Sequence, residues 1–325
     1  DYLVINHDEP DHSGSLNALL KEYPDIQVVG NAKTFAPLEA FYGEIPNKKI
    51  VTECDALDLG THRLQFFMVP MVHWPESMVS YESTNHILFS NDAFGGFGTL
   101  NGGIFDDQVN IAFYEDEMRR YYANIVAKVA APTLKAIERL CSIDIKMIAP
   151  SHGLIWRSHP EWVVGKYCQW SRQEGEEGLV IVYGTMYGNT GHMAELIARG
   201  AADAGIKEIR IYDISKTETS FIMSDIWKYK GLAIGSCSHY GSLYPNLTML
   251  VHTINEFKPQ NKSCALFGGM SWSGGGLKTL AKYAEEGHWK LVGDCVEVKG
   301  APIREADEER LYEMGRTLAE AIKTA

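Results

Sequence analysis

The second half of the chain alternates short apolar runs with helical patterns, and this feature constrains the fold more than any other. Five apolar runs follow one another from residue 179 onwards, with helical patterns between them. Strands that alternate with helices build a parallel sheet covered by helices on both faces. We therefore expect a doubly wound α/β domain with strands at 179–183, 208–212, 231–235, 263–267 and 290–298.

A polar stretch from Arg172 to Gly178, which contains two glycines, separates this half from the first. Both flanking segments contain enough apolar residues for a core of their own. We therefore expect two domains, at residues 1–174 and 178–325. The first combines a long helical pattern at 108–140 with several apolar runs, which is typical of a layered α+β domain. These runs lie at 2–6, 26–29, 49–52, 64–69, 87–90 and 146–149.

The composition excludes several classes of protein. Of 325 residues, 45% are hydrophobic and 22% charged, as in folded globular proteins. No apolar run reaches the roughly 18 residues that a membrane helix requires. A net charge of -12 disfavours a nucleic-acid partner. The six cysteines form no C-x-x-C pair, which predicts neither a disulfide framework nor a thiolate metal site and favours the cytoplasm.

Four side chains that commonly bind metals crowd into six positions after the first apolar run. Pro10 lies among them and disfavours a regular helix or a central strand, so we expect a loop. Charge repulsion and lost hydration make such a cluster costly unless a cation holds it together. The sequence therefore predicts a metal site that includes His7, Glu9, Asp11 and His12.

Three further candidates each follow an apolar run, and strand ends at one edge of a layered fold can converge. They are His73, Asp92 and His152. Any one of the seven residues, taken alone, is better explained as an ordinary surface or core residue. The ordered set of seven favours metal binding.

The spacing H-x-E-x-D-H, followed by H-W-P, S-N-D and S-H-G, resembles the metallo-β-lactamase-like domain of flavodiiron proteins. Hydrolases related to that domain carry H-x-H-x-D-H, and Glu9 stands in the place of their second histidine. The resemblance implies αββα layers and a dinuclear iron site, although the residue that matches His12 binds no metal in some relatives. Imidazoles and carboxylates suit iron, whereas zinc offers no redox chemistry. By the family's pattern one iron takes His7, Glu9 and His73, the other takes Asp11, His12 and His152, and Asp92 bridges them.

A second constellation follows the strand at 179–183, where G-T-M-Y-G-N-T opens a helix. Backbone N–H groups at a helix N-terminus can bind a phosphate without a lysine, and the Walker lysine is absent. This loop resembles the phosphate loop of flavodoxins, and two later loops match those that bracket the flavin ring, with Cys237-Ser238 where relatives commonly carry Pro-Thr. A tight turn and a packing tryptophan are the simpler alternatives. The resemblance implies FMN binding by Thr185, Met186, Tyr187, Gly188, Asn189, Thr190, Ser236, Cys237, Ser238, His239, Tyr240, Gly241, Gly269, Met270, Ser271, Trp272, Ser273 and Gly274.

FMN and two irons can together store four electrons. Four electrons reduce O2 to two waters, and two electrons reduce two NO to N2O. The resemblance therefore implies an oxygen or nitric oxide reductase, with a flavodoxin-like domain that supplies electrons, and the same ligands can serve both gases. Two alternatives remain: a metallo-β-lactamase-fold hydrolase with an attached flavodoxin domain, and an electron carrier with an empty metal site.

The resemblance also implies partners and one further site residue. Electrons come from a rubredoxin-like donor or a reduced deazaflavin, and a head-to-tail homodimer, with a tetramer as the alternative, brings flavin and iron together. Family members carry additional strands before the H-x-E-x-D-H loop, so we expect that an N-terminal segment is missing here. A tyrosine near the irons matches Tyr121 or Tyr122, and since adjacent helix positions diverge by about 100°, only one can face the site.

Overall fold

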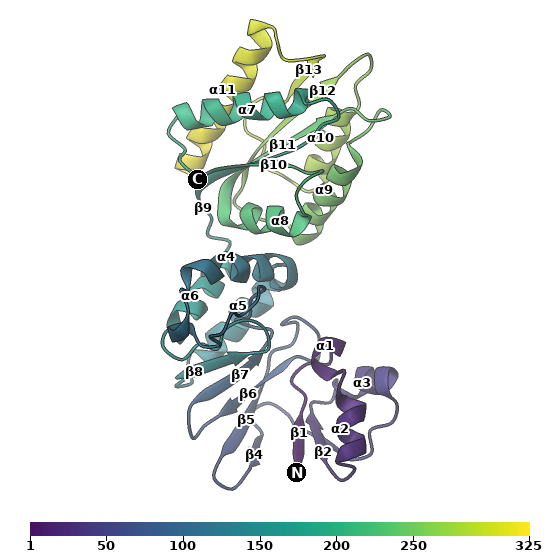
Figure 1. Ribbon diagram of the computed structural model, residues 1–325, viewed down its shortest axis with the longest axis vertical. Helices are drawn as coiled ribbons and strands as arrows, with labels where there is room; N and C mark the ends of the chain where they lie inside the picture. Colours follow the sequence, from purple (N-terminus) through teal and green to yellow (C-terminus); the bar gives the residue numbers. More distant parts are fainter. The chain divides into compact units, whose positions relative to one another are not determined.

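The computed structural model describes residues 1–325, which divide into two compact units, Asp1–Arg172 and Gln173–Ala325 (Figure 1). None of the helices combines the length and the apolar character needed to cross a membrane.

A five-stranded sheet forms the centre of the second unit, and all its neighbouring strands are parallel. Its strands are β9 (Glu176–Gly184), β10 (Ile209–Asp213), β11 (Tyr229–Cys237), β12 (Ser263–Met270) and β13 (Val296–Lys299). Their order is β10-β9-β11-β12-β13. β10 therefore lies on one side of β9, and the later strands β11, β12 and β13 lie on the other. Ligands of such folds bind at the carboxyl ends of the strands next to this change of side, here β9 and β11.

Five helices cover both faces of this sheet (Figure 1). They are α7 (Asn189–Asp203), α8 (Thr219–Lys228), α9 (Pro245–Phe257), α10 (Gly276–Glu286) and α11 (Glu305–Thr324). Successive residues of a strand point to opposite faces. Leu179 and Ile181 of β9 accordingly pack in one core with α7 and α11, and Val180 and Val182 pack in the other with α8, α9 and α10. The predicted doubly wound α/β fold is confirmed.

Two sheets form the first unit. One contains the parallel strands β1 (Tyr2–Val4), β2 (Gln27–Gly30) and β3 (Lys48–Ile50). The other, in the order β4-β5-β6-β7-β8, is antiparallel except for its last pair. Its strands are β4 (Ala56–Asp58), β5 (Arg63–Met68), β6 (Met78–Glu82), β7 (Ile87–Asn91) and β8 (Met147–Pro150). Val29 of the first sheet shares one core with Phe66 and Met78 of the second, so the two sheets pack against each other.

Helices cover the outer face of each sheet, which completes the predicted αββα layers (Figure 1). Leu16, Phe35 and Leu38 pack on Val28 of the first sheet. The helices on that side are α1 (Pro10–Ser13), α2 (Leu16–Glu22) and α3 (Phe35–Tyr42), and those on the other side are η1 (Asp106–Gln108), α4 (Ala112–Tyr121), η2 (Tyr122–Val126), η3 (Ala127–Val129), α5 (Ala130–Leu140) and α6 (Pro160–Ser171). The predicted helical pattern at 108–140 is thus interrupted by a π-helical turn, η2, and a 3-10 turn, η3.

Candidate metal centre and flavin loops

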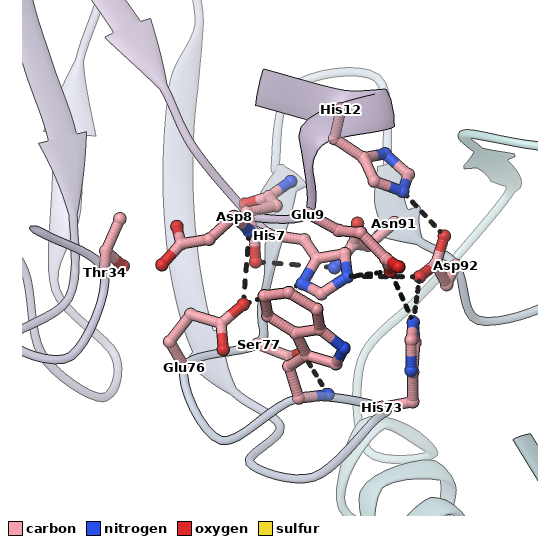
Figure 2. Close-up of polar contacts among 12 residues, drawn as sticks. His7, Asp8, Glu9, His12, Thr34, His73, Glu76, Ser77, Asn91 and Asp92 are labelled. Carbon is pink, nitrogen blue, oxygen red and sulfur yellow. Dashed lines mark hydrogen bonds and ion pairs between the residues drawn. The ribbon is translucent and has the colours of Figure 1, made fainter. Parts of the chain in front are cut away.

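The seven predicted metal ligands converge at one edge of the first unit. Figure 2 shows His7, Glu9, His12, His73 and Asp92 among them. The seven residues lie on segments that follow β1, β5, β7 and β8, as the expectation of converging strand ends required. The ligand atoms form two groups, and within each group all of them lie within 4.8 Å of one another. The groups are His7, Glu9, His73 and Asp92, and Asp11, His12 and His152.

Asp92 lies between the two groups and directs one carboxylate oxygen to each. Its Oδ2 is 2.9 Å from Nε2 of His73 and 3.5 Å from Nε2 of His7. Its Oδ1 is 3.1 Å from Nε2 of His12 and 3.3 Å from Nε2 of His152. All four imidazoles therefore present the same nitrogen, Nε2, to one carboxylate.

Each group contains a second carboxylate opposite Asp92. Oε2 of Glu9 is 3.2 Å from Nε2 of His7 and 3.1 Å from Nε2 of His73. Oδ2 of Asp11 is 3.3 Å from Nε2 of His152 and 3.5 Å from Nε2 of His12. Each half of the cluster thus offers two imidazole nitrogens and two carboxylate oxygens, with Asp92 common to both.

The cluster fits two metal ions better than it fits a hydrogen-bond network. Nε2 of His12 and Oδ1 of Asp92 are buried, and neither completes a hydrogen bond of good geometry although they are close together. Buried polar atoms normally find a partner. Ligands about 2.1 Å from one ion lie no more than about 4.2 Å apart, which is close to the observed spacing. Imidazole with carboxylate is a donor set suited to iron.

Electrostatics indicate the same cation requirement. Burial alone would raise the pKa of Asp92, but the imidazoles of His12, His152 and His73 outweigh burial and hold that pKa well below its usual range. The Asp92 carboxylate in turn raises the pKa of His152, and it raises that of His73 against the opposing effect of burial. Without metal, protons would have to supply the positive charge, so metal binding releases protons.

One local expectation was wrong. Asp11 and His12 do not lie on a loop but in the one-turn helix α1, which has Pro10 in its first turn. Proline is well tolerated at that place because the first N–H groups of a helix have no intrahelical partner. The N–H groups of His12 and Ser13 both donate to the carbonyl of Glu9 and hold the turn.

The structure adds Glu76, which the sequence analysis missed, to the surroundings of the metal cluster. Oε1 of Glu76 is 2.7 Å from Nδ1 of His7 and also accepts the backbone N–H of Asp8 at 3.2 Å (Figure 2). The side chain of Asn31 donates to the backbone carbonyl of Glu76. A carboxylate on the second ring nitrogen fixes the tautomer and orientation of a metal-binding histidine. The sequence signal was an acidic residue three positions after His73.

Asp8 is a second buried carboxylate that the sequence analysis missed. It is fully buried, and neither of its oxygens has a hydrogen-bond partner. Burial, together with the nearby Glu76, raises the pKa of Asp8 to about 8. The protonated, neutral form of Asp8 is therefore favoured, which limits the negative charge around His7, where Glu9, Glu76 and Asp92 already lie.

The two candidate tyrosines point in different directions, as adjacent helix positions require. The ring of Tyr121 is buried with its centroid 5.7 Å from that of His152. The hydroxyl of Tyr122 instead lies 2.9 Å from that of Ser171, and its ring packs on Tyr167. Tyr121 belongs to the surroundings of the cluster, whereas Tyr122 belongs to the core.

The phosphate loop precedes α7 in the second unit. Gly188 adopts φ 89°, in the region that favours glycine, and its N–H donates to Oγ1 of Thr185 at 3.0 Å. Oγ1 of Thr190, in the first turn of α7, is buried without a hydrogen-bond partner. This orphaned hydroxyl and the free N–H groups at the start of α7 match the oxygens of an FMN phosphate.

A cavity of about 630 Å³ lies beside this loop, within the second unit. The rings of Tyr240 and Trp272 on its walls are 98% and 89% exposed, so they are available to a flavin ring. Its lining consists of Met186, Tyr187, Ser238, His239, Tyr240, Gly241, Ser271, Trp272 and Ser273. Ser236 is fully buried and is not among these residues; its hydroxyl donates to the carbonyl of Cys237 and accepts the N–H of Tyr244. Cys237, Gly269, Met270 and Gly274 also lie outside the lining.

Comparisons with known proteins cover both units. A family described as "ODP family beta lactamase" matches residues 1–153, and the flavodoxin family matches residues 181–314. A nitric oxide reductase from Moorella thermoacetica is 33% identical over 99% of this chain and 81% of its own length. The anaerobic nitric oxide reductase flavorubredoxin of Escherichia coli is 31% identical over 98% of this chain and 67% of its own length.

Solved structures agree with these relatives over the full chain. Rubredoxin oxygen:oxidoreductase from Desulfovibrio gigas superposes with a TM-score of 0.95 at 33% identity, covering 100% of this chain and 81% of that one. The flavodiiron protein from Giardia intestinalis has the same TM-score at 26% identity, covering 100% and 80%. A metallo-β-lactamase-like unit joined to a flavodoxin-like unit defines a flavin- and metal-dependent oxidoreductase. The chain belongs to the flavodiiron protein family.

The contact between Glu76 and His7 generates a prediction about metal affinity. Glu76→Gln removes the charge that orients His7, and changes of this kind typically lower metal affinity about 10- to 100-fold. We expect this loss for the ion of the His7 half of the cluster, measured by competition with a chelator. Asp106→Asn is the matched control, because Asp106 is a buried carboxylate of the same unit that accepts backbone N–H groups from Arg157, Ser158 and His159. Equal metal affinity in Glu76→Gln and the wild type would contradict the assigned role.

Proposed function

We propose that the seven clustered residues hold two irons, at which this oxidoreductase reduces O2 to water or NO to N2O with electrons from FMN in the second unit. The observation that carries the proposal is the position of Asp92, whose two oxygens each lie beside a pair of imidazoles. A carboxylate in this position can bridge two ions. The two irons, when bound, supply a place for the gas and accept electrons one at a time, and FMN supplies electrons in pairs.

Glu9 favours this function over hydrolysis. A hydrolase needs a metal that activates water, and histidine fills this position in the hydrolases that the motif resembles. The Glu9 carboxylate adds negative charge beside His7 and His73, which stabilises metal ions of higher charge. The first half of the cluster is therefore suited to an ion that changes its oxidation state.

Tyr121 can hold a proton beside the cluster. Burial, together with the negative charge of Asp92, raises the pKa of Tyr121 far above its usual value, so the phenol keeps its proton at all physiological pH values. A protonated phenol near His152 can donate a hydrogen bond to an oxygen atom in the cluster. Both reductions consume protons, so such a donor is useful in either.

The residues of the second unit hold FMN. Thr185, Asn189 and Thr190 bind its phosphate together with the N–H groups at the start of α7, and Tyr240 and Trp272 contact its ring. We propose a rubredoxin-like protein as the electron donor, with a reduced deazaflavin as the alternative, and the cytoplasm as the location.

The function is tested by reducing the iron- and FMN-loaded protein without oxygen and then mixing it with O2 or NO. We expect rapid reoxidation of the flavin, with water or N2O as the product and about two irons and one FMN per chain. Full activity with zinc after growth in iron-replete medium would contradict the proposal.

Tyr121 and Tyr122 provide a matched pair of variants. We expect Tyr121→Phe to lower kcat about 100-fold or more and to change the pH profile of turnover, because the proton donor is lost. Tyr122→Phe should leave turnover unchanged and cost about 1 kcal/mol of stability, since it loses the hydrogen bond to Ser171 in the core. Unchanged turnover in Tyr121→Phe would exclude the proton-donor role.

We propose a head-to-tail homodimer as the active unit, because the metal cluster and the flavin cavity belong to different units of the chain. In a two-fold symmetric dimer, the flavin of each chain would lie beside the irons of the other chain. The test mixes two inactive variants: Asn189→Asp/Thr190→Asp, which repels the phosphate, and His152→Ala, which loses an iron ligand.

Each heterodimer of these variants retains one intact pair of sites across the chains. We therefore expect part of the activity to return after subunit exchange. Heterodimers that form but remain inactive would show that transfer occurs within one chain.

A further inference from the structure

A second cavity of the flavodoxin-like unit, of about 520 Å³, lies at the edge of the sheet where β12 begins. The segments that follow α9 and α10, residues 258–262 and 287–290, form much of its wall. The flavin cavity lies at the opposite edge, where β11 and β12 end, and the two cavities share no residue. This second cavity therefore belongs neither to the flavin site nor to the metal cluster.

Three lysines line this cavity, and none of them lies within ion-pair distance of a carboxylate. They are Lys258, Lys262 and Lys290. The one acidic side chain of the lining, Glu286, lies 3.6 Å from Lys282 instead. The backbone oxygen of Ala325, also in the lining, accepts Nζ of Lys230 at 2.7 Å. In a chain of net charge -12, three unpaired positive charges around one cavity favour an anionic ligand.

Lys262 is the lining residue that most requires a counter-charge. Only 6% of it is exposed, and its Nζ donates to the backbone carbonyls of Tyr229 at 2.7 Å and Trp227 at 3.3 Å. An ammonium group has three N–H donors, so one of them has no protein acceptor. Burial lowers the pKa of Lys262 to about 7, because an unpaired charge is costly away from water. A bound anion would supply the missing negative charge.

The next residue, Ser263, adds a second unsatisfied group to the lining. It is 1% exposed, and its Oγ has no hydrogen-bond partner. Buried hydroxyls normally find one. Two consecutive buried side chains of the lining, an ammonium and a hydroxyl, thus have hydrogen-bonding capacity that the oxygen atoms of a ligand can use.

The remaining lining includes apolar side chains. Leu232 and Ile254 are buried members of the core between the sheet and helices α8, α9 and α10. The half-buried Trp289 also lines the cavity, and its Nε1 donates to Oδ1 of Asn255 at 2.8 Å, which fixes the ring. A ligand that matches the whole lining therefore carries hydrocarbon beside its charged group.

We propose that this cavity binds a small organic carboxylate, with the charged group at the lysines and the hydrocarbon part on Leu232 and Ile254. Its volume of about 520 Å³ is within the range of small-molecule sites, roughly 300 to 1,000 Å³. Hydrogen bonds between ammonium and carboxylate groups are among the strong ones, because both partners are charged. The site adds a ligand to those of the proposed function and does not depend on it.

The first measurement is calorimetric titration of the iron- and FMN-loaded chain with three probes. Octanoate combines charge and hydrocarbon, octanol lacks the charge, and inorganic phosphate lacks the hydrocarbon. We expect one octanoate per chain, bound at least tenfold more tightly than either of the other probes. No binding of octanoate, or equal binding of octanol or phosphate, would overturn the proposal. A crystal structure of the octanoate complex gives the location, and octanoate found only at another site would also overturn it.

The second measurement repeats the octanoate titration with variants. Lys258→Gln/Lys290→Gln removes two exposed charges of the lining, and Lys207→Gln is the matched control, because Lys207 is an exposed lysine of the same unit outside the cavity. We expect the double variant to bind octanoate at least tenfold more weakly and the control to match the wild type. Unchanged affinity in the double variant would overturn the proposal.

Lys262→Met tests the buried charge, since methionine is also unbranched and carries no charge. We expect octanoate binding to fall at least tenfold while FMN stays bound, and retained affinity in the folded variant would overturn the proposal. If Lys262→Met does not fold, the exposed pair Lys258→Gln/Lys290→Gln still decides. None of these measurements depends on turnover, so their failure is distinct from a failure of the proposed function.

Discussion

The attraction between Asp92 and four imidazoles is the interaction on which the rest of the first unit depends. Four nitrogen atoms lie within 3.5 Å of this one buried carboxylate. The assembly accumulates three carboxylates in a small volume, and two metal ions compensate their charge. Because the seven residues come from segments after four different strands, metal ions bound by them would also tie together the two sheets of the unit.

Contacts beyond the ligands give the two halves of the cluster different surroundings. The His7 half has Glu76 on the far nitrogen of His7 and the buried Asp8 beside it. The other half has the ring of Tyr121 beside His152 and lies next to the loop of Phe94. One half is thus supported by negative charge and the other faces a phenol and an apolar wall. This division suits a centre in which the residues that adjust the charge of the metal site differ from those that contact the substrate.

Much of this could be predicted from the sequence, because ligand spacing and strand–helix alternation are local patterns. The clustering of the seven candidate ligands and the parallel sheet were accessible in this way. Strand β6 was not, since all five of its residues are buried and show no alternation, and the three residues of β4 are too few for a pattern. Glu76 could not be assigned either, because its role depends on a contact with His7 across 69 positions of sequence. The helix around His12 was missed because Pro10 was interpreted as a breaker when it occupies a first turn.

The central claim is that one carboxylate is shared by two irons, and Mössbauer spectroscopy of the iron-loaded protein tests it most directly. The account predicts two irons per chain that are magnetically coupled in the oxidised wild type. In Asp92→Ala it predicts the loss of this coupling and of at least one iron, with FMN still bound to the second unit. Two uncoupled irons in the wild type, or coupling that persists in Asp92→Ala, would contradict it.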